Sequence, residues 1–353
     1  MAHRDHAHRL SVMAMPIQVS FPMALTVAIE LRVFEIIAES GPGAQLFPSE
    51  IVAKMPTTNP NAATALDRIL RILVANSLLT VQETNDGEGV RMYGLTDQSR
   101  CLVPGDDGVS LAPLVLFCLQ KPTLDCFYHL GASVLEGGPT PFHRTHGMDL
   151  FEYAATDQKF RGLFHEAMRN VTVIILTEVL EGYKGFSEVK EMVDVGGGNG
   201  TSINLIVSKY PHIRAVNYDL PCVIAGAPSY PGVEHIPEDM FESVPPTETI
   251  FMRGILHNWG DDKCLKLLMN CWKALPDGGK VISVEFVIPP ILGTDHVSRF
   301  TTGLDLLIMP IFIGGKERPA SEYCDLAKAA GFFETKVFPI SNGIAVMEFC
   351  KRL

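Results

Sequence analysis

The chain has 353 residues, of which 47% are hydrophobic, and it carries a formal net charge of −11. This length suits about two domains, and the apolar content supports a large buried core, which excludes a disordered chain. No block of basic residues is present to neutralise phosphates, so we expect no nucleic-acid partner.

The eight cysteines are scattered and show no C-x-x-C spacing. A chain of this size does not need disulfides, so this usage indicates buried, reduced thiols in a cytoplasmic protein, and we predict no metal site. The polar start of the chain does not resemble a secretory leader. We find no uninterrupted apolar stretch of ~18 residues and therefore expect no membrane segment.

Residues 1–110 are predicted to form a mostly helical winged-helix domain, in which two helices and a hairpin follow one another. The second helix carries few basic side chains, so we favour a dimerisation and lid domain over DNA binding. The apolar start of the chain has little sequence before it, so a partner subunit can cover it, although docking on its own domain is an alternative. The predicted elements are helices over 24–38, 47–55 and 61–76 and hairpin strands over 78–83 and 91–96, around a turn at 85–87.

Residues 111–353 are predicted to form the catalytic domain, which begins with a helical substrate-pocket segment over 111–190. Helical patterns cover 110–135 and 149–183, with a loop over 137–147. Phe160, Phe164 and Met168 are spaced to lie on one helical face. These three side chains either pack in the core or line a pocket for a flat aromatic substrate.

The central feature of the catalytic half is a glycine loop with Gly196, Gly198 and Gly200, which stands between a short strand and a helix. Such a loop suits a nucleotide site, because glycine permits sharp turns and close ligand approach. The third glycine of the dinucleotide fingerprint would fall on Thr201, so a nucleoside fits better than a pyrophosphate. Asp219 ends the next strand and is placed to accept hydrogen bonds from ribose hydroxyls. An ordinary tight turn is the alternative for the loop.

Strands and helices alternate from residue 191 onward, which predicts a doubly wound parallel α/β sheet. The last two strands, over 333–340 and 343–351, are joined by a hairpin signal and should pair antiparallel. A nicotinamide-binding domain has six parallel strands, so this ending disfavours an NAD-type oxidoreductase. The pattern resembles the class I methyltransferase fold.

Five ordered motifs make the resemblance specific over nearly the whole chain. The chain resembles a plant S-adenosylmethionine-dependent small-molecule O-methyltransferase and is most similar to the caffeic acid and 5-hydroxyferulic acid O-methyltransferase group. This resemblance implies a homodimer that forms through the N-terminal domain, with no metal. The motifs are Asp194-Val-Gly-Gly-Gly-Asn-Gly200, Asp219-Leu-Pro, Asp239-Met-Phe, His257-Asn-Trp and Gly314-Gly-Lys-Glu-Arg318.

The resemblance implies a cofactor site for S-adenosylmethionine. In it Gly196 lies against the cofactor, Asp219 binds the ribose hydroxyls, and Asp239 with Met240 flanks the adenine. Family members usually carry a lysine that contacts the cofactor where this chain has Arg253, and the planar guanidinium of arginine reaches differently from the lysine ammonium.

The resemblance also implies that His257 is the catalytic base, bracketed by Glu285 and Glu317. A neutral imidazole suits removal of a phenolic proton. Without the family motifs, His257 would as readily bond backbone in a loop, and Glu317 would read as part of a solvated charge run. Glu285 interrupts an apolar strand, where a carboxylate needs a partner, which favours a function.

The pocket implied by the resemblance differs from that of the caffeic acid group. Leu119 and Ala154 stand where that group carries the asparagine and histidine that bind the propanoid tail, and Phe312 replaces an asparagine near the loop. We therefore predict a larger phenolic substrate, such as a lignan or benzylisoquinoline alkaloid, with a monolignol acid as the alternative. The complete set of predicted pocket residues is Leu119, Ala154, Phe160, Phe164, Met168, Asn258, Ile308 and Phe312.

Overall fold

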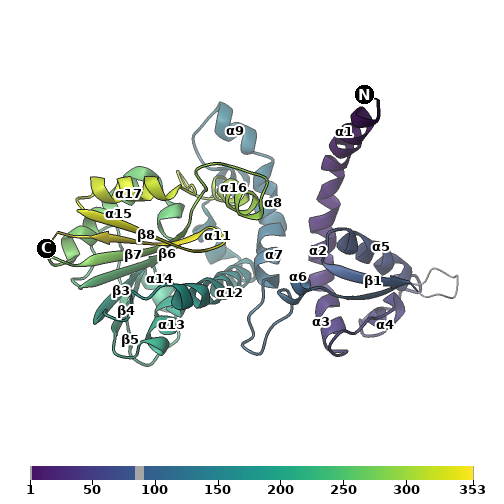
Figure 1. Cartoon of the computed structure of the whole chain (residues 1–353), viewed down its shortest axis with the longest axis horizontal. Coiled ribbons are helices and arrows are strands. Elements are labelled where there is room, and N and C mark those ends of the chain that lie inside the picture. The colour runs from purple at the N-terminus through teal and green to yellow at the C-terminus, as the bar shows by residue number, and fades with distance from the viewer. Residues whose placement is uncertain (1, 84–90, 353) are drawn as a thin grey trace. The chain divides into compact units, whose positions relative to one another are not determined.

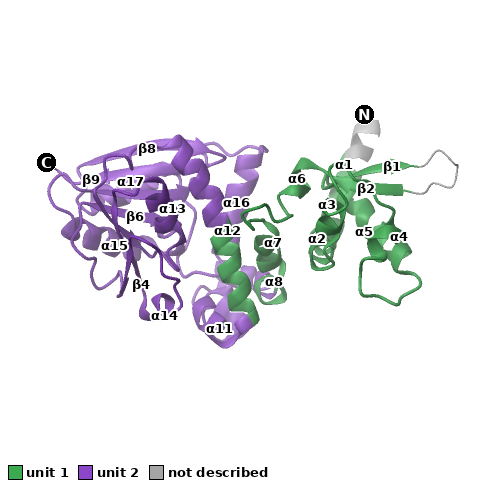
Figure 2. Cartoon of the chain, turned by 90° about the horizontal axis from the view of Figure 1, so that it is seen from below, with its two compact units in different colours: residues 1–124, 159–170 green, residues 125–158, 171–353 purple. Residues whose placement is uncertain are grey.

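The computed structural model describes residues 2–83 and 91–352. Two compact units make up the chain: Met1–Leu124 with Lys159–Asn170, and Asp125–Gln158 with Val171–Leu353 (Figure 2). This division follows packing, so the predicted functional boundary between residues 110 and 111 stays a prediction. The two units are described separately.

The first unit contains the expected helices and hairpin, packed around one apolar core. Strands β1 (Leu79–Glu83) and β2 (Arg91–Leu95) pair antiparallel, and the predicted turn at 85–87 lies outside the described residues. The predicted helix over 24–38 is broken, because Arg32 adopts a left-handed conformation with φ of 57° between two shorter helices. The helices are α1 (Ala2–Ala14), α2 (Ser20–Glu30), α3 (Val33–Ala38), α4 (Pro48–Val52), α5 (Ala62–Ala75), α6 (Asp97–Arg100) and α7 (Ala112–Leu119), with a 3-10 turn over Met15–Val19.

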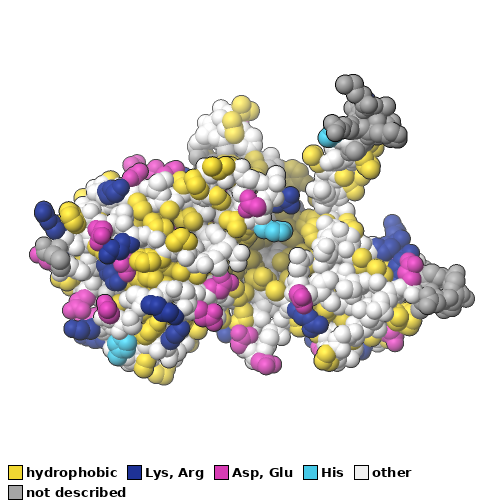
Figure 3. Space-filling model, in the orientation of Figure 1, with side chains coloured by type: hydrophobic (Ala, Val, Ile, Leu, Met, Phe, Trp, Pro, Cys, Tyr) yellow, Lys and Arg dark blue, Asp and Glu magenta, His cyan; other side chains and the backbone are white. Residues whose placement is uncertain are grey.

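The N-terminal helices expose an apolar surface, which Figure 3 shows as yellow side chains below the grey atoms of the first residues. The helical stretch His8–Glu30 is long and apolar enough to cross a bilayer by length and composition alone. The sequence predicts no membrane segment by the criterion of an uninterrupted apolar run, and this stretch is not such a run. Its most exposed apolar side chains are Leu10, Val12, Met13, Met15, Ile17 and Val19.

The second unit is built on a seven-stranded sheet with the order β5-β4-β3-β6-β7-β9-β8 (Figure 1). β3 to β7 run parallel, whereas β9 pairs antiparallel with both β7 and β8. The predicted class I methyltransferase sheet with a terminal hairpin is therefore confirmed. The strands are β3 (Glu191–Val195), β4 (Arg214–Asp219), β5 (Val233–Pro237), β6 (Thr249–Arg253), β7 (Lys280–Phe286), β8 (Glu334–Ser341) and β9 (Ile344–Cys350).

Helices cover both faces of this sheet. Alternate side chains of the central strands are therefore buried on opposite sides. On β6, Phe251 packs toward α12 (Gln158–Gly182) and α13 (Thr201–Lys209). Its neighbours Ile250 and Met252 pack toward α15 (Asp261–Ala274) and α17 (Ala320–Ala329). Burial on both faces fixes the central strands, and their carboxyl ends carry the predicted site.

Several helices differ from the sequence-based expectation. The predicted loop over 137–147 contains α10 (Pro141–His146), which begins where the Thr140 hydroxyl accepts a hydrogen bond from the His143 N–H. It ends at Gly147 in a left-handed conformation, so local capping creates a helix where loop residues prevail. The remaining helices are α8 (Lys121–Phe127), α9 (Leu130–Leu135), α11 (Leu150–Thr156), α14 (Pro221–Ile224) and α16 (His296–Ile308).

Candidate active site

The site is organised around His257, which lies on a 3-10 turn over Leu256–Asn258 just after β6. Its Nδ1 atom is 2.6 Å from Oε1 of Glu317, whose side chain is fully buried. A carboxylate can only accept a hydrogen bond, so the proton resides on Nδ1. The opposite nitrogen, Nε2, is thereby left as an acceptor, which is the form a general base needs.

The surroundings favour the protonated form of this imidazole. Burial lowers the pKa of His257, but the hydrogen bond that its Nδ1–H donates to Glu317 and the charges of Glu317 and Glu285 raise this pKa by more. The net effect is a pKa above the usual histidine value. The site therefore stabilises the imidazolium that forms when Nε2 takes a proton.

Glu317 and the histidine turn are held by a network that spans about sixty residues of sequence. The Glu317 N–H donates to Oδ1 of Asp305 on α16 at 2.9 Å. Arg318 is fully buried and donates to the carbonyl oxygens of Leu256 (3.0 Å) and Trp259 (2.8 Å). These bonds fix the backbone on both sides of the His257–Glu317 pair and so restrict the positions of both side chains.

Sequence reasoning missed the parts played by Arg318 and Asp305. Arg318 ends the motif that begins at Gly314, and its place in that motif could have identified it. Asp305 lies inside a helix, where nothing in the neighbouring sequence distinguishes it. Asp261, in the first turn of α15 after its N-cap Gly260, accepts hydrogen bonds from Arg318 at 2.6 and 3.2 Å.

The second predicted carboxylate, Glu285 on β7, is buried beneath the same turn. Its Oε1 accepts hydrogen bonds from the N–H groups of Ile255 (3.3 Å) and Leu256 (3.2 Å) and from the Ser283 hydroxyl (3.2 Å). Burial is the largest of the effects that raise the pKa of Glu285. Of the two glutamates, Glu317 is the one that hydrogen-bonds the imidazole, whereas Glu285 holds the backbone that precedes it.

The glycine loop after β3 brings its backbone close to neighbouring groups. Gly196 has a φ of +70°, and a Cβ there would lie 2.5 Å from the Ile255 side chain. A Cβ on Gly197 would lie 2.1 Å from Oδ1 of Asn217 and 2.7 Å from the Asp194 carboxylate. Because Ile255 also precedes the histidine turn, the glycine loop and the turn contact each other directly.

Asp219 closes the same loop, at the carboxyl end of β4. Its Oδ2 accepts a hydrogen bond from the Gly198 N–H at 2.8 Å, and Oδ1 accepts one from the Leu220 N–H at 2.7 Å. Burial raises the pKa of Asp219 more than these two bonds lower it. Each oxygen keeps further accepting capacity, which a pair of vicinal hydroxyls can use.

Two buried oxygens beneath the loop, Oδ2 of Asp194 and Oδ1 of Asn217, have no hydrogen-bond partner within the described part of the chain. Burial raises the pKa of Asp194 to about 7. Arg253, at the end of β6, lies near Asp194 and Glu285, and burial lowers its pKa more than these carboxylates raise it. The loop is therefore a polar, partly unsatisfied cradle.

The remaining predicted cofactor residues, Asp239 and Met240, follow β5. Oδ1 of Asp239 accepts a hydrogen bond from the Phe241 N–H at 2.8 Å, and Met240 is half-buried. The Met240 carbonyl accepts from the Asn270 side chain at 3.1 Å. This turn is thus tied to α15, at the same edge of the sheet as Asp219.

Two predicted pocket residues, Ile308 and Phe312, lie beside the histidine turn. A Cβ on Gly315 would lie 2.8 Å from Phe312, 3.0 Å from Ile308 and 3.1 Å from the His257 carbonyl oxygen, so these groups converge there. The ring of Phe312 lies 5.8 Å from that of Phe151 on α11, the helix that carries the buried Ala154.

Asn258, the residue after the histidine, donates from Nδ2 to the Gly254 carbonyl oxygen at 3.2 Å.

The other predicted pocket residues belong to the first unit. There Phe160 and Phe164 pack against Phe117, with ring centroids 5.5 and 5.2 Å apart. Leu119, which ends α7, and Met168 belong to the same unit. The approach of these four predicted pocket residues to His257 stays a prediction.

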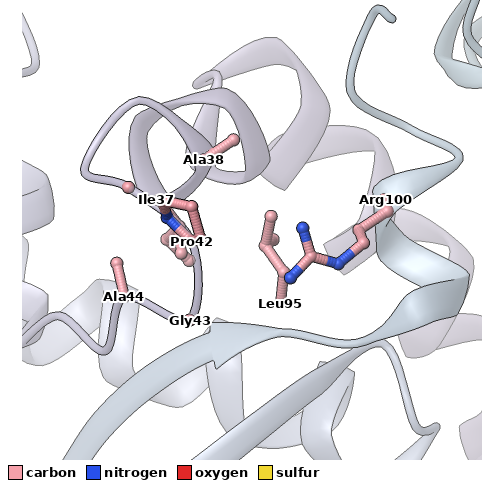
Figure 4. Close-up of a pocket in the computed structure, with 8 residues that line it drawn as sticks. Ile37, Ala38, Pro42, Gly43, Ala44, Leu95 and Arg100 are labelled. Carbon is pink, nitrogen blue, oxygen red and sulfur yellow. The ribbon is translucent and has the colours of Figure 1, made fainter.

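A cavity of about 140 Å³ in the first unit offers no comparable chemistry (Figure 4). Its one ionisable side chain is the half-exposed Arg100, so it has no acid–base pair. Within residues 2–83 and 91–352, no group of three His, Cys, Asp or Glu is placed to hold a metal ion. The cavity is lined by Ile37, Ala38, Gly41, Pro42, Gly43, Ala44, Leu95 and Arg100.

Comparison with known proteins identifies the family. Residues 127–333 match the O-methyltransferase domain, and residues 17–105 match the O-methyltransferase dimerisation domain. The chain therefore belongs to the plant O-methyltransferases and is an S-adenosylmethionine-dependent O-methyltransferase, as predicted.

Three plant relatives span nearly the full chain. The (S)-scoulerine 9-O-methyltransferase of Coptis japonica is 52% identical over 99% of this chain and 91% of its own length. Desmethyl-yatein O-methyltransferase of Sinopodophyllum hexandrum is 48% identical, covering 94% of both chains. Caffeic acid 3-O-methyltransferase of Medicago sativa is 46% identical over 94% of this chain and 91% of its own.

Among solved structures, human N-acetylserotonin methyltransferase in complex with SAM superposes with a TM-score of 0.81 at 23% identity. The match covers 99% of this chain and 98% of the human one. At this identity the likeness establishes the shared fold.

The His257–Glu317 pair generates a test of acid–base behaviour. Replacing Glu317 by glutamine keeps an acceptor near Nδ1 but removes the negative charge that raises the pKa of His257. Neutral His257 is the active form, so activity rises as pH rises through this pKa. In Glu317→Gln we expect the acidic limb of the kcat profile to move to lower pH, with kcat reduced on the order of 10²-fold.

The matched control is Glu322→Gln. Glu322 lies on the following helix, α17, and its exposed carboxylate pairs with Lys316. It should leave both the limb and kcat unchanged. An unshifted acidic limb in Glu317→Gln would contradict the role of this carboxylate.

Proposed function

We propose that this enzyme transfers the methyl group of S-adenosylmethionine to a phenolic hydroxyl of a plant specialised metabolite, with His257 as general base. The single observation that supports this most strongly is the 2.6 Å contact between Glu317 and Nδ1 of His257, on a turn that touches the glycine loop. The substrate classes we favour are lignans, phenylpropanoids and benzylisoquinoline-type phenols.

The residues around the glycine loop suit an adenosyl cofactor. We assign Gly196 to close backbone contact, Asp219 to the ribose hydroxyls, and Asp239 with Met240 to the adenine. We assign Arg253, at the end of β6 near the carboxylates of Asp194 and Glu285, to a contact with the cofactor. S-adenosylmethionine supplies, when bound, an electrophilic methyl group on a sulfonium and leaves as S-adenosylhomocysteine.

His257 supplies what a phenol lacks at neutral pH. A phenolic hydroxyl resembles that of tyrosine, with a pKa near ~10, so it is a poor nucleophile until its proton is removed. Nε2 accepts this proton as the oxygen attacks the methyl group, and Glu317 stabilises the resulting imidazolium through Nδ1. Base assistance of this kind typically contributes ~10²–10⁴-fold, and positioning of the reactants contributes much of the remainder.

The substrate class follows from the apolar pocket positions and from the relatives. The packing of Phe312 on Phe151, a residue of the helix that carries the buried Ala154, supports an apolar end of the proposed pocket. The names of two relatives refer to scoulerine and desmethyl-yatein, and that of a third to caffeic acid. We favour the larger phenols, because Leu119, Ala154 and Phe312 offer no polar partner for a propanoid tail.

We further propose a cytoplasmic homodimer that forms through residues 1–110. The dimerisation-domain match and the exposed apolar side chains along residues 10–19 support this arrangement. Burying such a surface against a second copy is favourable by about 25 cal/mol per Å² of apolar area removed from water. We assign no nucleic-acid or membrane partner.

The proposed function is tested with S-adenosylmethionine labelled on its methyl group. We expect label to reach the hydroxyl of large phenols in the presence of the wild-type enzyme and to depend on His257. Mass spectrometry of a panel of lignans, alkaloid phenols, caffeate and 5-hydroxyferulate gives the acceptor. Rates with the two acids that match those with the larger phenols would favour the monolignol alternative, and label reaching no phenol would refute the proposal.

The apolar pocket end makes its own prediction. The variant Leu119→Asn/Ala154→His/Phe312→Asn adds polar groups for a propanoid tail. Each hydrogen bond gained should favour caffeate by ~1–3 kcal/mol. We expect kcat/KM for caffeate relative to a large phenol to rise by at least tenfold. The control Met269→Asn alters an exposed residue of α15 and should leave this ratio unchanged. An unchanged ratio in the triple variant would show that these positions do not select the substrate.

A further inference from the structure

Gly254 occupies an unusual place beside the reacting nitrogen. It follows β6 directly and has a φ of +60°, a conformation that favours glycine. A Cβ built there would lie 3.4 Å from Nε2 of His257 and 3.9 Å from Cε1. Apart from its chain neighbours, no other described atom comes within 4 Å of that position. The missing side chain therefore leaves open space on the Nε2 side of the ring.

The backbone at Gly254 is fixed on both sides. Its N–H donates to the Val284 carbonyl oxygen at 3.0 Å, which extends the β6–β7 pairing. Its carbonyl oxygen accepts from Nδ2 of Asn258 at 3.2 Å, which closes the histidine turn. A side chain added at this position cannot swing aside without breaking one of these bonds, so it would stay next to Nε2.

Nε2 is the nitrogen that faces the acceptor, because Nδ1 is bound to Glu317. A hydroxyl that hydrogen-bonds to a nitrogen lies roughly 2.7–3.0 Å away. A carbon 3.4 Å from the same nitrogen competes for the volume around that hydroxyl. After the carbons of the ring, the substrate atoms nearest to the hydroxyl are those of its ortho substituents.

We propose that Gly254 determines specificity by leaving room beside Nε2 for a phenol whose reacting hydroxyl has a bulky ortho neighbour, such as a methoxy group or a fused ring. This inference rests on the proposed role of His257 and adds a substrate feature to it. In place of glycine, even a methyl group would contact the ortho substituent. A phenol with a bare ortho position would still reach Nε2.

The test compares Gly254→Ala with wild type on two phenols that share a scaffold and differ only in an ortho methoxy group. We expect kcat/KM to fall at least tenfold more for the ortho-methoxy phenol than for its unsubstituted partner. The dissociation constant of S-adenosylmethionine, measured by calorimetry, should change less than twofold. Equal losses on the two phenols, or no loss, would overturn the inference.

A matched control separates steric exclusion from backbone strain. Gly232 has a φ of +76° and open space around its Cβ, in the turn before β5. Gly232→Ala therefore introduces similar strain in the same unit without approaching His257, and it should leave the ratio of the two phenols unchanged. If Gly254→Ala does not fold, Gly254→Asn serves instead, because asparagine adopts positive φ more readily.

The two proposals fail in different ways. Wild-type turnover of both phenols is measured in the same assay, together with cofactor binding. Loss of methyl transfer to every phenol by the wild type would overturn the proposed function and this inference with it. Normal wild-type turnover with an unchanged ratio in Gly254→Ala would overturn this inference alone.

Discussion

The hydrogen bond between Glu317 and His257 is the interaction on which the site depends. It joins two segments that are 60 residues apart and sets which imidazole nitrogen is free to accept a proton. The fold holds both partners from outside the pair: Arg318 binds the carbonyl groups of the histidine turn, and Asp305 binds the backbone of Glu317. A general base must take up a proton and release it again. The fixed tautomer therefore matters more for its function than the free energy that the hydrogen bond contributes to folding.

The sheet places this pair next to the cradle after β3. In a parallel sheet the carboxyl ends of neighbouring strands meet at one edge, so the glycine loop, Asp219 and the histidine turn are brought together by topology. The contact between Ile255 and Gly196 makes the proximity close. Gly196 is one partner in this contact, and Gly254 directly precedes the other; we propose that these two glycines leave space for the cofactor and the acceptor.

Much of this arrangement was predictable from the sequence because its signals are local. The glycine loop, Asp219 after the next strand, and the antiparallel ending follow from residue spacing and strand alternation. The choice between Glu285 and Glu317 was not predictable, since it depends on which carboxylate reaches Nδ1 in three dimensions. The contribution of Asp305 was hidden for the same reason. The helix α10 was missed because capping by Thr140 outweighed a composition typical of loops.

The most direct test of the account is an NMR titration of the His257 imidazole, labelled with ¹⁵N, in wild type and in Glu317→Gln. We predict that the neutral ring carries its proton on Nδ1, that its pKa in the wild type lies above the usual histidine value, and that this pKa falls in the variant. A neutral ring protonated on Nε2, or a pKa that is the same in both proteins, would contradict it.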